Sequence, residues 1–189
     1  DSKLILNSLL VLIPKKSNKK FKKSFDSISV LLSRYFAGLI LQIFILFIIY
    51  TILLLIIGTP NAIVIAFLCS LLNLIPFIGP FIGGILMILL TMSSHITQDF
   101  STVILAKAIY VAIGFAIGQL IDNFFSQPFI FSNSVKSHPL EIFIVIISGG
   151  LLFGAVGMIA AVPTYTALKV IGKEFLSENR IIKELTKNL

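Results

Sequence analysis

The side chains able to do chemistry in this chain are few. Lys107 and Asp122 both interrupt otherwise uncharged sequence. At about 100° per residue, a helix would place them on one face with Gly114 and Gly118, and with Gln119 at its edge. A charge within a bilayer normally faces protein or water, because lipid cannot solvate it. Such a polar, small-residue face would line a cavity or pack closely on a neighbour, and the carboxylate of Asp122 could exchange a proton or bind a cation if burial raises its pKa. The competing interpretation is a solvated, idle acid at a helix end.

A second group of candidate residues surrounds a break in the most apolar part of the sequence, LNLIPFIGPFIGGIL. Asn73 precedes Pro76, Gly79 and Pro80, and prolines interrupt helical hydrogen bonding. Inside a membrane such a break is tolerated where protein or a water-filled cavity satisfies the freed backbone groups. These four residues therefore predict a re-entrant hairpin that could hold a substrate or ion. The alternative is a kinked helix pair with a Pro-Gly turn at the surface, and Asn73 could then have a purely structural task.

The histidines and the single cysteine offer little further chemistry. His138, which precedes a proline, could shuttle protons or could simply shape a loop. We interpret His95 as a loop residue and Cys69 as inert packing, and one cysteine permits no disulfide within the chain. No nucleotide-binding, zinc-protease or serine-hydrolase pattern occurs. The sequence therefore predicts no catalytic residue, no metal site, no cofactor and no enzymatic activity.

The elements that must position these residues are membrane helices. Hydrophobic residues make up 57% of the 189 and charged residues 12%. No Asp, Glu, Lys or Arg occurs from Phe36 to Gln98 or from Ile142 to Leu168, and runs of about 20 apolar residues are typical of membrane-spanning helices. The sequence predicts an all-α, polytopic helical membrane protein with a Pro/Gly-broken re-entrant helical hairpin. We expect apolar helices over 36–57, 62–75, 77–92, 102–123, 141–147 and 151–168, the last two joined by Ser148, Gly149 and Gly150.

Charge is concentrated at the two ends, which divides the chain into three parts. Residues 1–35 form a basic amphipathic segment, cytoplasmic or interfacial, or else a solvated connector; 36–168 form the transmembrane domain; and 169–189 form a charged cytoplasmic helix. Basic flanks usually stay in the cytoplasm, so both ends are predicted to be cytoplasmic, with an even number of complete crossings. The net charge of +7 comes without a nucleic-acid-binding motif. We therefore expect the lipid bilayer, and no nucleic acid, as a partner.

Three G-x-x-x-G pairs add a packing signal: Gly79–Gly83, Gly114–Gly118 and Gly150–Gly154. Such pairs let membrane helices approach each other closely. Helix packing is our interpretation of each pair, and the glycine faces also suggest a homo-oligomer.

Six segments carry, in order, a resemblance to a known family: LIPKKSNKK, SRYFAG, LLNLIPFIGPFIGGIL, GQLIDNFFSQPFI, SVKSHPLEIF and GGLLFGAVGMIAAVPTYTALK. As a set they resemble the autoinducer-2 exporter family of membrane permeases, the PerM-like proteins, over about residues 11–172. The chain is similar to the C-terminal half only of those proteins. The resemblance implies that Gln119, an acid at position 122 and Pro128 recur among its members, which makes Gln119, Asp122 and Pro128 candidate residues of a substrate or ion pathway. It also implies that Gly157 belongs to the glycine series of Gly150 and Gly154.

What the resemblance implies about function is transport of a small molecule or ion across the cytoplasmic membrane of a bacterium, without ATP hydrolysis. Some members are described as exporters of a small signalling molecule, and others as sodium–proton antiporters. A membrane scaffold or oligomerisation subunit without transport of its own is the alternative, and an intramembrane enzyme is a third hypothesis. A transporter needs a water-accessible polar cavity near Pro76 and Asp122, whereas a scaffold would pack those groups dry.

Overall fold

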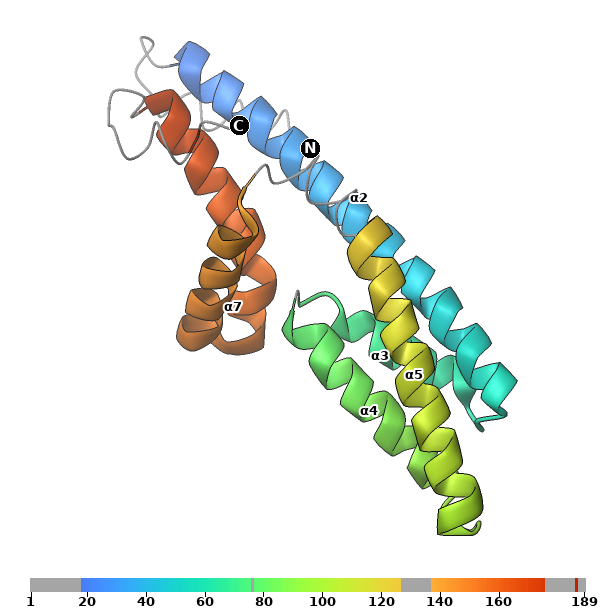
Figure 1. Ribbon diagram of the computed structural model, residues 1–189. Helices are drawn as coiled ribbons and strands as arrows, with labels where there is room; N and C mark the ends of the chain where they lie inside the picture. The colour runs from blue at the N-terminus through green and yellow to red at the C-terminus, as the bar shows by residue number, and fades with distance from the viewer. Residues whose placement is uncertain (1–17, 76, 127–136, 176–185, 187–189) are drawn as a thin grey trace. The chain divides into compact units, whose positions relative to one another are not determined.

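The computed structural model describes residues 18–75, 77–126, 137–175 and 186. Within these ranges every regular element is a helix, which confirms the predicted all-α class (Figure 1). The chain divides into two compact units, unit 1 with residues 1–36 and 131–189 and unit 2 with residues 37–130. The predictions for Pro76, for Pro128, for residues 1–17 and for most of the C-terminal tail lie outside the described residues.

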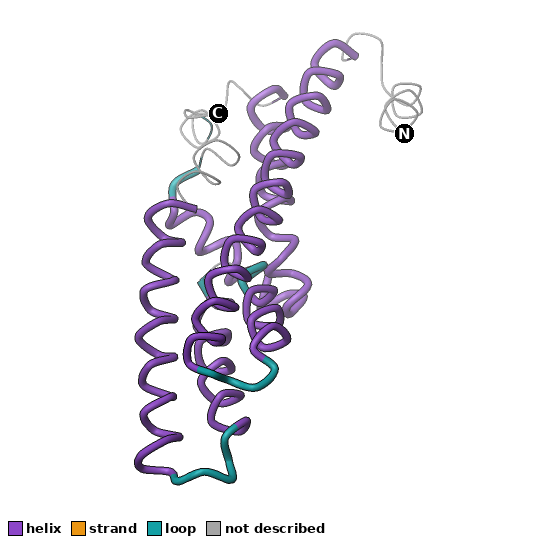
Figure 2. Tube along the Cα trace, turned by 90° about the vertical axis from the view of Figure 1, so that its right-hand side faces the viewer, coloured by secondary structure: helices purple, strands orange, loops and turns teal. Residues whose placement is uncertain are grey.

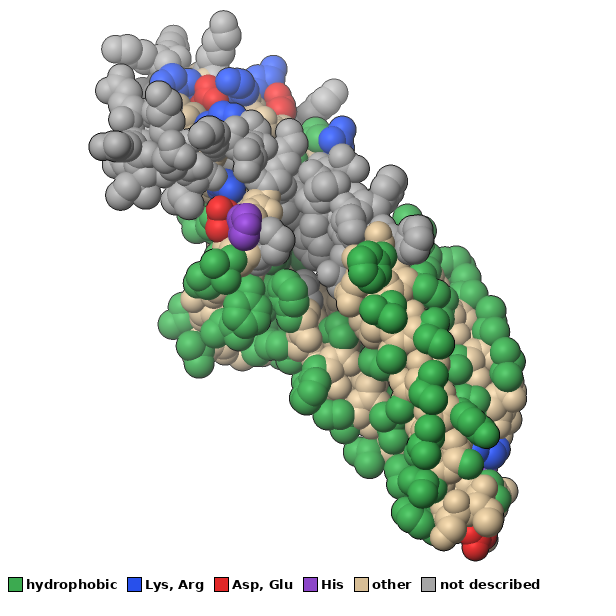
Figure 3. All heavy atoms as spheres, viewed as in Figure 1, with side chains coloured by type: hydrophobic (Ala, Val, Ile, Leu, Met, Phe, Trp, Pro, Cys, Tyr) green, Lys and Arg blue, Asp and Glu red, His purple; other side chains and the backbone are tan. Residues whose placement is uncertain are grey.

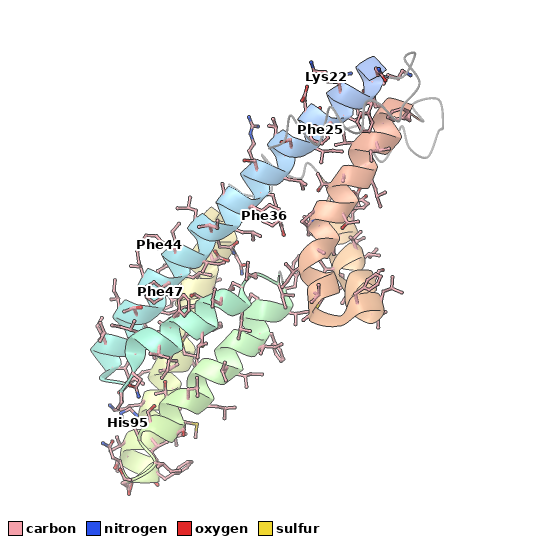
Figure 4. The ribbon with its side chains drawn as sticks, turned by 180° about the vertical axis from the view of Figure 1, so that it is seen from behind. Lys22, Phe25, Phe36, Phe44, Phe47 and His95 are labelled. Carbon is pink, nitrogen blue, oxygen red and sulfur yellow. The ribbon has the colours of Figure 1, made fainter. Side chains whose placement is uncertain are left out.

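α2, Asn18–Ile57, is a single helix of 40 residues, about 60 Å long at 1.5 Å per residue. The sequence predicted an amphipathic segment and a separate span here, but the helix is continuous because the junction contains no proline and no turn signal. In unit 2 one stripe of α2 is enclosed, with Leu46, Tyr50 and Leu54 fully buried, while Phe44 on another face is 57% exposed (Figure 4).

α3, Ala62–Leu72, and α4, Ile78–Ser94, are the predicted broken pair. They lie against each other as a hairpin (Figure 1 and Figure 2). The regular ladder of α3 gives way to tighter bonds such as that from Ile75 N to Leu72 O. Phe77 then takes a φ of 66°, a left-handed conformation that is rare for a bulky residue. At roughly 16 Å and 25 Å, both arms are shorter than a hydrocarbon core of about 30 Å.

α5, Leu105–Ile121, is flanked by two π-helical segments, η2 at Phe100–Ile104 and η3 at Asp122–Ser126. Lys107, near the start of α5, donates a hydrogen bond to the carbonyl oxygen of Ile57, the last residue of α2. The end of α5 reaches the middle of α2. The two helices therefore run antiparallel.

The α3–α4 hairpin begins and ends at the same end of unit 2. α3 follows the turn at Gly58, and His95, which ends α4, has its Nε2 3.3 Å from the carbonyl oxygen of Gly58 (Figure 4). The break after Asn73 is therefore the far tip of the hairpin, and it lies partway along α2. A hairpin with both ends on one side has the geometry expected of a re-entrant segment.

Unit 1 contains α7, Pro139–Phe175, which folds back on itself at Gly154, where φ is 62° and ψ is −146° (Figure 1). Tyr165 Oη donates to Glu141 at 3.0 Å, although a straight helix would hold these residues about 36 Å apart. The prediction that Ser148–Gly150 joins two helices is wrong. Those residues stay helical, and the chain reverses at the following glycine because few other residues adopt this backbone conformation.

Many large hydrophobic side chains of unit 2 are exposed, among them Ile56 at 80% and Phe81 at 72%. The flank of unit 2 seen in Figure 3 is almost wholly hydrophobic, and charged side chains appear on it only near one end. Among the described residues three helices are long and apolar enough to cross a membrane: Lys20–Ile57, Phe100–Phe124 and Leu140–Phe175. The third is folded at Gly154, so its first arm is only about 22 Å long.

Candidate functional site

The buried polar side chains of unit 2 include a network at the tip of the α3–α4 hairpin. Gln119 Nε2 on α5 donates to Tyr50 Oη on α2 at 2.6 Å and to Asn73 Oδ1 at the end of α3 at 3.3 Å. One amide thus joins three elements. Asn73 and Gln119, both predicted as pathway residues, lie together here.

Asp122 lies one helical turn beyond Gln119 and is 1% exposed. Gln42 Nε2 on α2 donates to Asp122 Oδ2 at 2.7 Å. The donor is a neutral amide, so this short hydrogen bond positions the carboxyl group without adding a positive charge beside it. The alternative of a solvated acid at a helix end does not fit this burial. The carboxylate lies inside the packed unit, next to the network around Gln119.

Three residues that the sequence analysis singled out, Asn73, Gly79 and Pro80, allow the chain to pass from α3 to α4. Asn73 Nδ2 donates to the carbonyl oxygen of Cys69 at 3.1 Å, which supplies a donor at the end of α3. Gly79 lets α4 begin directly against α3, because a Cβ there would overlap the carbonyl oxygen of Leu72. Pro80 lies in the first turn of α4, where its missing N–H removes no helical hydrogen bond. Asn73 therefore has the structural task considered for it, and its Oδ1 also reaches the network.

The backbone around the network is specialised as well. η3 begins at Asp122, and π-helical turns are frequent at functional sites because they re-aim side chains. The ring of Tyr50 stacks on Phe115 with centroids 5.3 Å apart and planes at 22°. Stacking fixes the ring, so the phenol oxygen is held toward Gln119.

His138, the other predicted proton carrier, belongs to unit 1 and not to the unit that contains Asp122. It is exposed, and its Nδ1 accepts a hydrogen bond from Leu140 N at 3.3 Å, within the first turn of α7. This geometry fits the interpretation of a residue that shapes a loop.

The glycines predicted to pack helices lie against other parts of this chain, with one exception. Gly83 meets α3, Gly114 and Gly118 meet α2, and Gly150 and Gly157 lie between the arms of α7. A Cβ at Gly154 would meet nothing within 4 Å. We therefore correct the packing role predicted for Gly154, because its positive φ gives it the reversal of the chain as its task.

A second polar cluster ties the arms of α7 together in unit 1. Glu141 Oε2 accepts hydrogen bonds from Tyr165 Oη at 3.0 Å and from Lys169 Nζ at 3.1 Å. Lys169 Nζ also donates to Ser137 Oγ at 3.0 Å, and its side chain is only 4% exposed. These contacts lie at the base of the hairpin, far along the chain from its tip at Gly154.

Sequence reasoning missed Gln42 and Tyr50. A signal for Gln42 was present, since it is the only amide between Phe36 and Ile57, and an intramembrane polar residue marks a functional candidate. Tyr50 and Gln42 also share the i+4 stripe of α2 that contains Leu46. Their partners on α5 could not be assigned without the register between the two helices.

Asp99 shows what a solvated acid looks like in the same unit. It is exposed, and it accepts hydrogen bonds from Thr102 N at 2.9 Å and Thr102 Oγ1 at 3.0 Å as the N-cap of the segment leading into α5. The backbone hydrogen bond from Thr102, followed by that from its hydroxyl, holds the pKa of Asp99 below its ordinary value. Among the described residues, no group of three His, Cys, Asp or Glu could hold a metal ion.

The model of the family described as AI-2E family transporter matches residues 1–177 of this chain. The chain belongs to the AI-2E transporter family. Membership confirms the resemblance noted in the sequence, and with the apolar helices it identifies a multi-pass membrane protein.

Three relatives of this AI-2E family chain have names that give transport as their proposed role. YrrI of Bacillus subtilis (strain 168) is 31% identical over 176 residues, which are 93% of this chain and 47% of YrrI. YueF of the same organism is 32% identical over 165 residues, 85% of this chain and 40% of YueF. MT0215 of Mycobacterium tuberculosis (strain CDC 1551 / Oshkosh) is 28% identical over 107 residues, 57% of this chain and 27% of MT0215. The chain thus spans less than half the length of these relatives, and no solved structure matches it.

Proposed function

We propose that this AI-2E family chain forms part of a secondary transporter that moves a small molecule or ion across the bacterial cytoplasmic membrane without ATP hydrolysis. The observation that carries the proposal is the burial of Asp122 beside the tip of a broken hairpin in a multi-pass membrane protein. A carboxylate in such a place is costly and is typical of ion and proton pathways.

The network assigns a task to each neighbour of Asp122. The carboxylate would take up a proton or a cation, and Gln42 would hold it in position through the 2.7 Å hydrogen bond. Gln119, Tyr50 and Asn73 would offer amide and phenol groups to a polar substrate at the tip of the hairpin. Since these groups are enclosed in the present conformation, transport requires the hairpin to move relative to α2 and α5.

The burial of Asp122 and the packing of the glycines bear on whether the chain transports a substrate or acts as a scaffold. Dry packing of Asp122 is what a scaffold would have, and a transporter in an occluded state has it too. The scaffold hypothesis depended on glycine faces left free for oligomerisation. Gly83, Gly114 and Gly118 instead lie against α3 and α2 of the same chain. This favours transport, while a homo-oligomer and cytoplasmic termini stay proposals of their own.

The test is flux in liposomes reconstituted with the protein at its native length. An entrapped pH-sensitive dye reports proton movement under an imposed pH or sodium gradient. We predict that Asp122→Asn lowers coupled flux to the level of empty liposomes, because the amide can neither exchange the proton nor balance a cation. Membrane insertion and the amount of reconstituted protein should not change.

Asp99→Asn is the matched control, since it removes an exposed acid of the same unit and should leave the flux as it is. Gln42→Leu should reduce coupled flux without abolishing it, because it removes one hydrogen bond to the carboxylate and leaves the carboxylate itself in place. Unchanged coupled flux in Asp122→Asn would contradict the assignment. Absence of flux in the unsubstituted protein under both gradients would favour the scaffold.

A further inference from the structure

A compact polar cluster lies at the end of unit 2 where α2 and α4 finish, away from the network around Asp122. Lys107 Nζ on α5 donates to the carbonyl oxygens of Ile57 at 2.9 Å and Gly58 at 3.3 Å. The same Nζ lies 2.9 Å from Nε2 of His95, which ends α4 and is 4% exposed. One ammonium group thus connects the start of α5 with the ends of α2 and α4.

The carbonyl groups at the end of α2 explain why a cation fits here. Gly58 N bonds to Leu55 O and Thr59 N bonds to Leu54 O, the pattern of a Schellman motif with Gly58 at a φ of 69°. That motif satisfies the carbonyl groups of Leu54 and Leu55, and it provides no donor for the carbonyl groups that follow, such as that of Ile57. Lys107 supplies the donor for Ile57 from another helix, where the helix dipole also favours a positive charge.

The hydrogen-bond partners of His95 define its proton arrangement. Nδ1 lies 2.9 Å from the carbonyl oxygen of Thr91, which can only accept, so Nδ1 carries a hydrogen. Nε2 faces the Lys107 ammonium, which can only donate, so Nε2 accepts. The pair therefore holds a single positive charge in this arrangement. A second proton would turn both partners into cations 2.9 Å apart, and protonated Nε2 would then compete for Gly58 O.

The other groups around His95 do not offer a compensating negative charge. The ends of α2 and α4 present carbonyl oxygens to it. Asp99, the acid nearest in sequence, is exposed and bonded to Thr102. Tyr110 on α5 is 60% exposed. A second positive charge in the cluster would therefore meet no acidic partner among the residues that the structure describes.

We propose that Lys107 and His95 form a proton-sensitive latch, in which protonation of His95 displaces the Lys107 ammonium and frees the start of α5 from the ends of α2 and α4. The latch lies at the open end of the α3–α4 hairpin, so its release would loosen the helices that enclose the hairpin. The latch goes beyond the proposed transport activity, and its test does not require a measurement of flux.

Cys69 provides the readout, because it is the only cysteine in the sequence and is fully buried. It packs in the same hydrophobic cluster as Val111, one turn beyond Lys107 on α5. Alkylation of Cys69 by N-ethylmaleimide is followed by mass spectrometry of its peptide, with the native-length protein in liposomes. Each rate is divided by the rate for denatured protein at the same pH, which removes the pH dependence of the thiol itself.

We expect normalised alkylation of Cys69 to rise several-fold when the pH is lowered from about 8 to about 5. His95→Gln keeps an acceptor for Lys107 without a titrating group, so it should stay protected at both pH values. Lys107→Met lacks the ammonium and should be labelled faster at both. Asp99→Asn is the matched control and should keep the full pH response.

Two results would overturn the latch. One is equal alkylation of the unsubstituted protein at both pH values. The other is a pH response in His95→Gln as large as that of the unsubstituted protein. The His95 variant decides the question by itself if Lys107→Met does not fold. Loss of flux in Asp122→Asn would leave these outcomes unaffected, so the failure of one proposal is distinguishable from the failure of the other.

Discussion

The α3–α4 hairpin of unit 2 and the α7 hairpin of unit 1 both reverse an apolar chain, but they do so by different means. The first turns through several residues, with Asn73 and a strained Phe77 at its tip and buried polar side chains beside it. The second turns at Gly154 alone, and its polar contacts lie at the base, between Glu141 and Lys169. Polar groups thus accompany both the tip and the open end of the first hairpin, whereas the polar contacts described in the second lie at its base.

The two tips also differ in how exposed their side chains are. Around the α7 reversal the apolar side chains are strongly exposed, with Leu151 at 84% and Val156 at 75%. Such a tip suits contact with lipid or other apolar surface. At the α3–α4 tip Asn73 is buried at 3% exposure. The tip of the first hairpin thus encloses an amide side chain, whereas the residues at the second reversal expose apolar side chains.

The largest effect is expected from a substitution that breaks the first hairpin, Gly79→Ala. The new Cβ would overlap the backbone at Leu72, so the two helices must separate. We expect a loss of about 3 kcal/mol in the free energy of unfolding, at the upper end of the usual cost of overpacking. Denaturation in detergent micelles, followed by circular dichroism, measures it.

Gly83→Ala is the control for that substitution. Its Cβ would lie 3.2 Å from the carbonyl oxygen of Cys69, a distance that a small shift can relieve. An equal loss of stability in both variants would mean that close approach along the whole hairpin, and not the break itself, controls its stability.

A smaller effect is expected from Gly154→Ala in the second hairpin. A Cβ has room there, but a φ of 62° with a ψ of −146° is a conformation that alanine rarely adopts. We expect a loss of about 2 kcal/mol from backbone strain alone. The same unfolding measurement tests it, with Gly150→Ala as a control because the atom nearest to its Cβ is the flexible end of Met158. A neutral Gly154→Ala would show that the reversal does not depend on glycine.

The smallest effect is expected at the base of the second hairpin, from Glu141→Gln. The substitution removes the ionic partner of Lys169, but the Glu141 side chain is 30% exposed, so solvent screens part of the interaction. We expect a loss of about 1 kcal/mol in the free energy of unfolding. Glu174→Gln, at the ion pair with the 71%-exposed Lys23, should lose less. Equal losses would indicate that the burial of Lys169 adds nothing to the interaction.

The sequence predicted the first hairpin better than the second for physical reasons. Pro76 and Pro80 interrupt a helix by their covalent structure, so the break is visible without tertiary information. Gly154 reverses the chain only because of its backbone angles, and a glycine in an apolar run is equally compatible with a helix. The sequence contained four glycines between residues 149 and 157 and no local signal that selected one of them.

The candidate site was predictable in part for a related reason. Helical periodicity alone placed Gly114, Gly118 and Asp122 on one face of α5, and that face does lie against α2. The partner Gln42 required the register of α5 against α2, which periodicity within one helix does not contain. His95 was interpreted as a loop residue because its contact with Lys107 depends on how the end of α4 packs against the start of α5, which the sequence does not show.

The uninterrupted length of α2 has a mechanical consequence. The stretch of α2 that belongs to unit 2, residues 37–57, is a rod of about 31 Å. If it tilts by roughly 10° about its midpoint, each end moves by about 3 Å, while a residue a turn or so from the midpoint moves by only about 1 Å. Gln42 is such a residue. The hydrogen bond from Gln42 to Asp122 could therefore persist through a rocking motion that moves both ends of this stretch relative to the neighbouring helices.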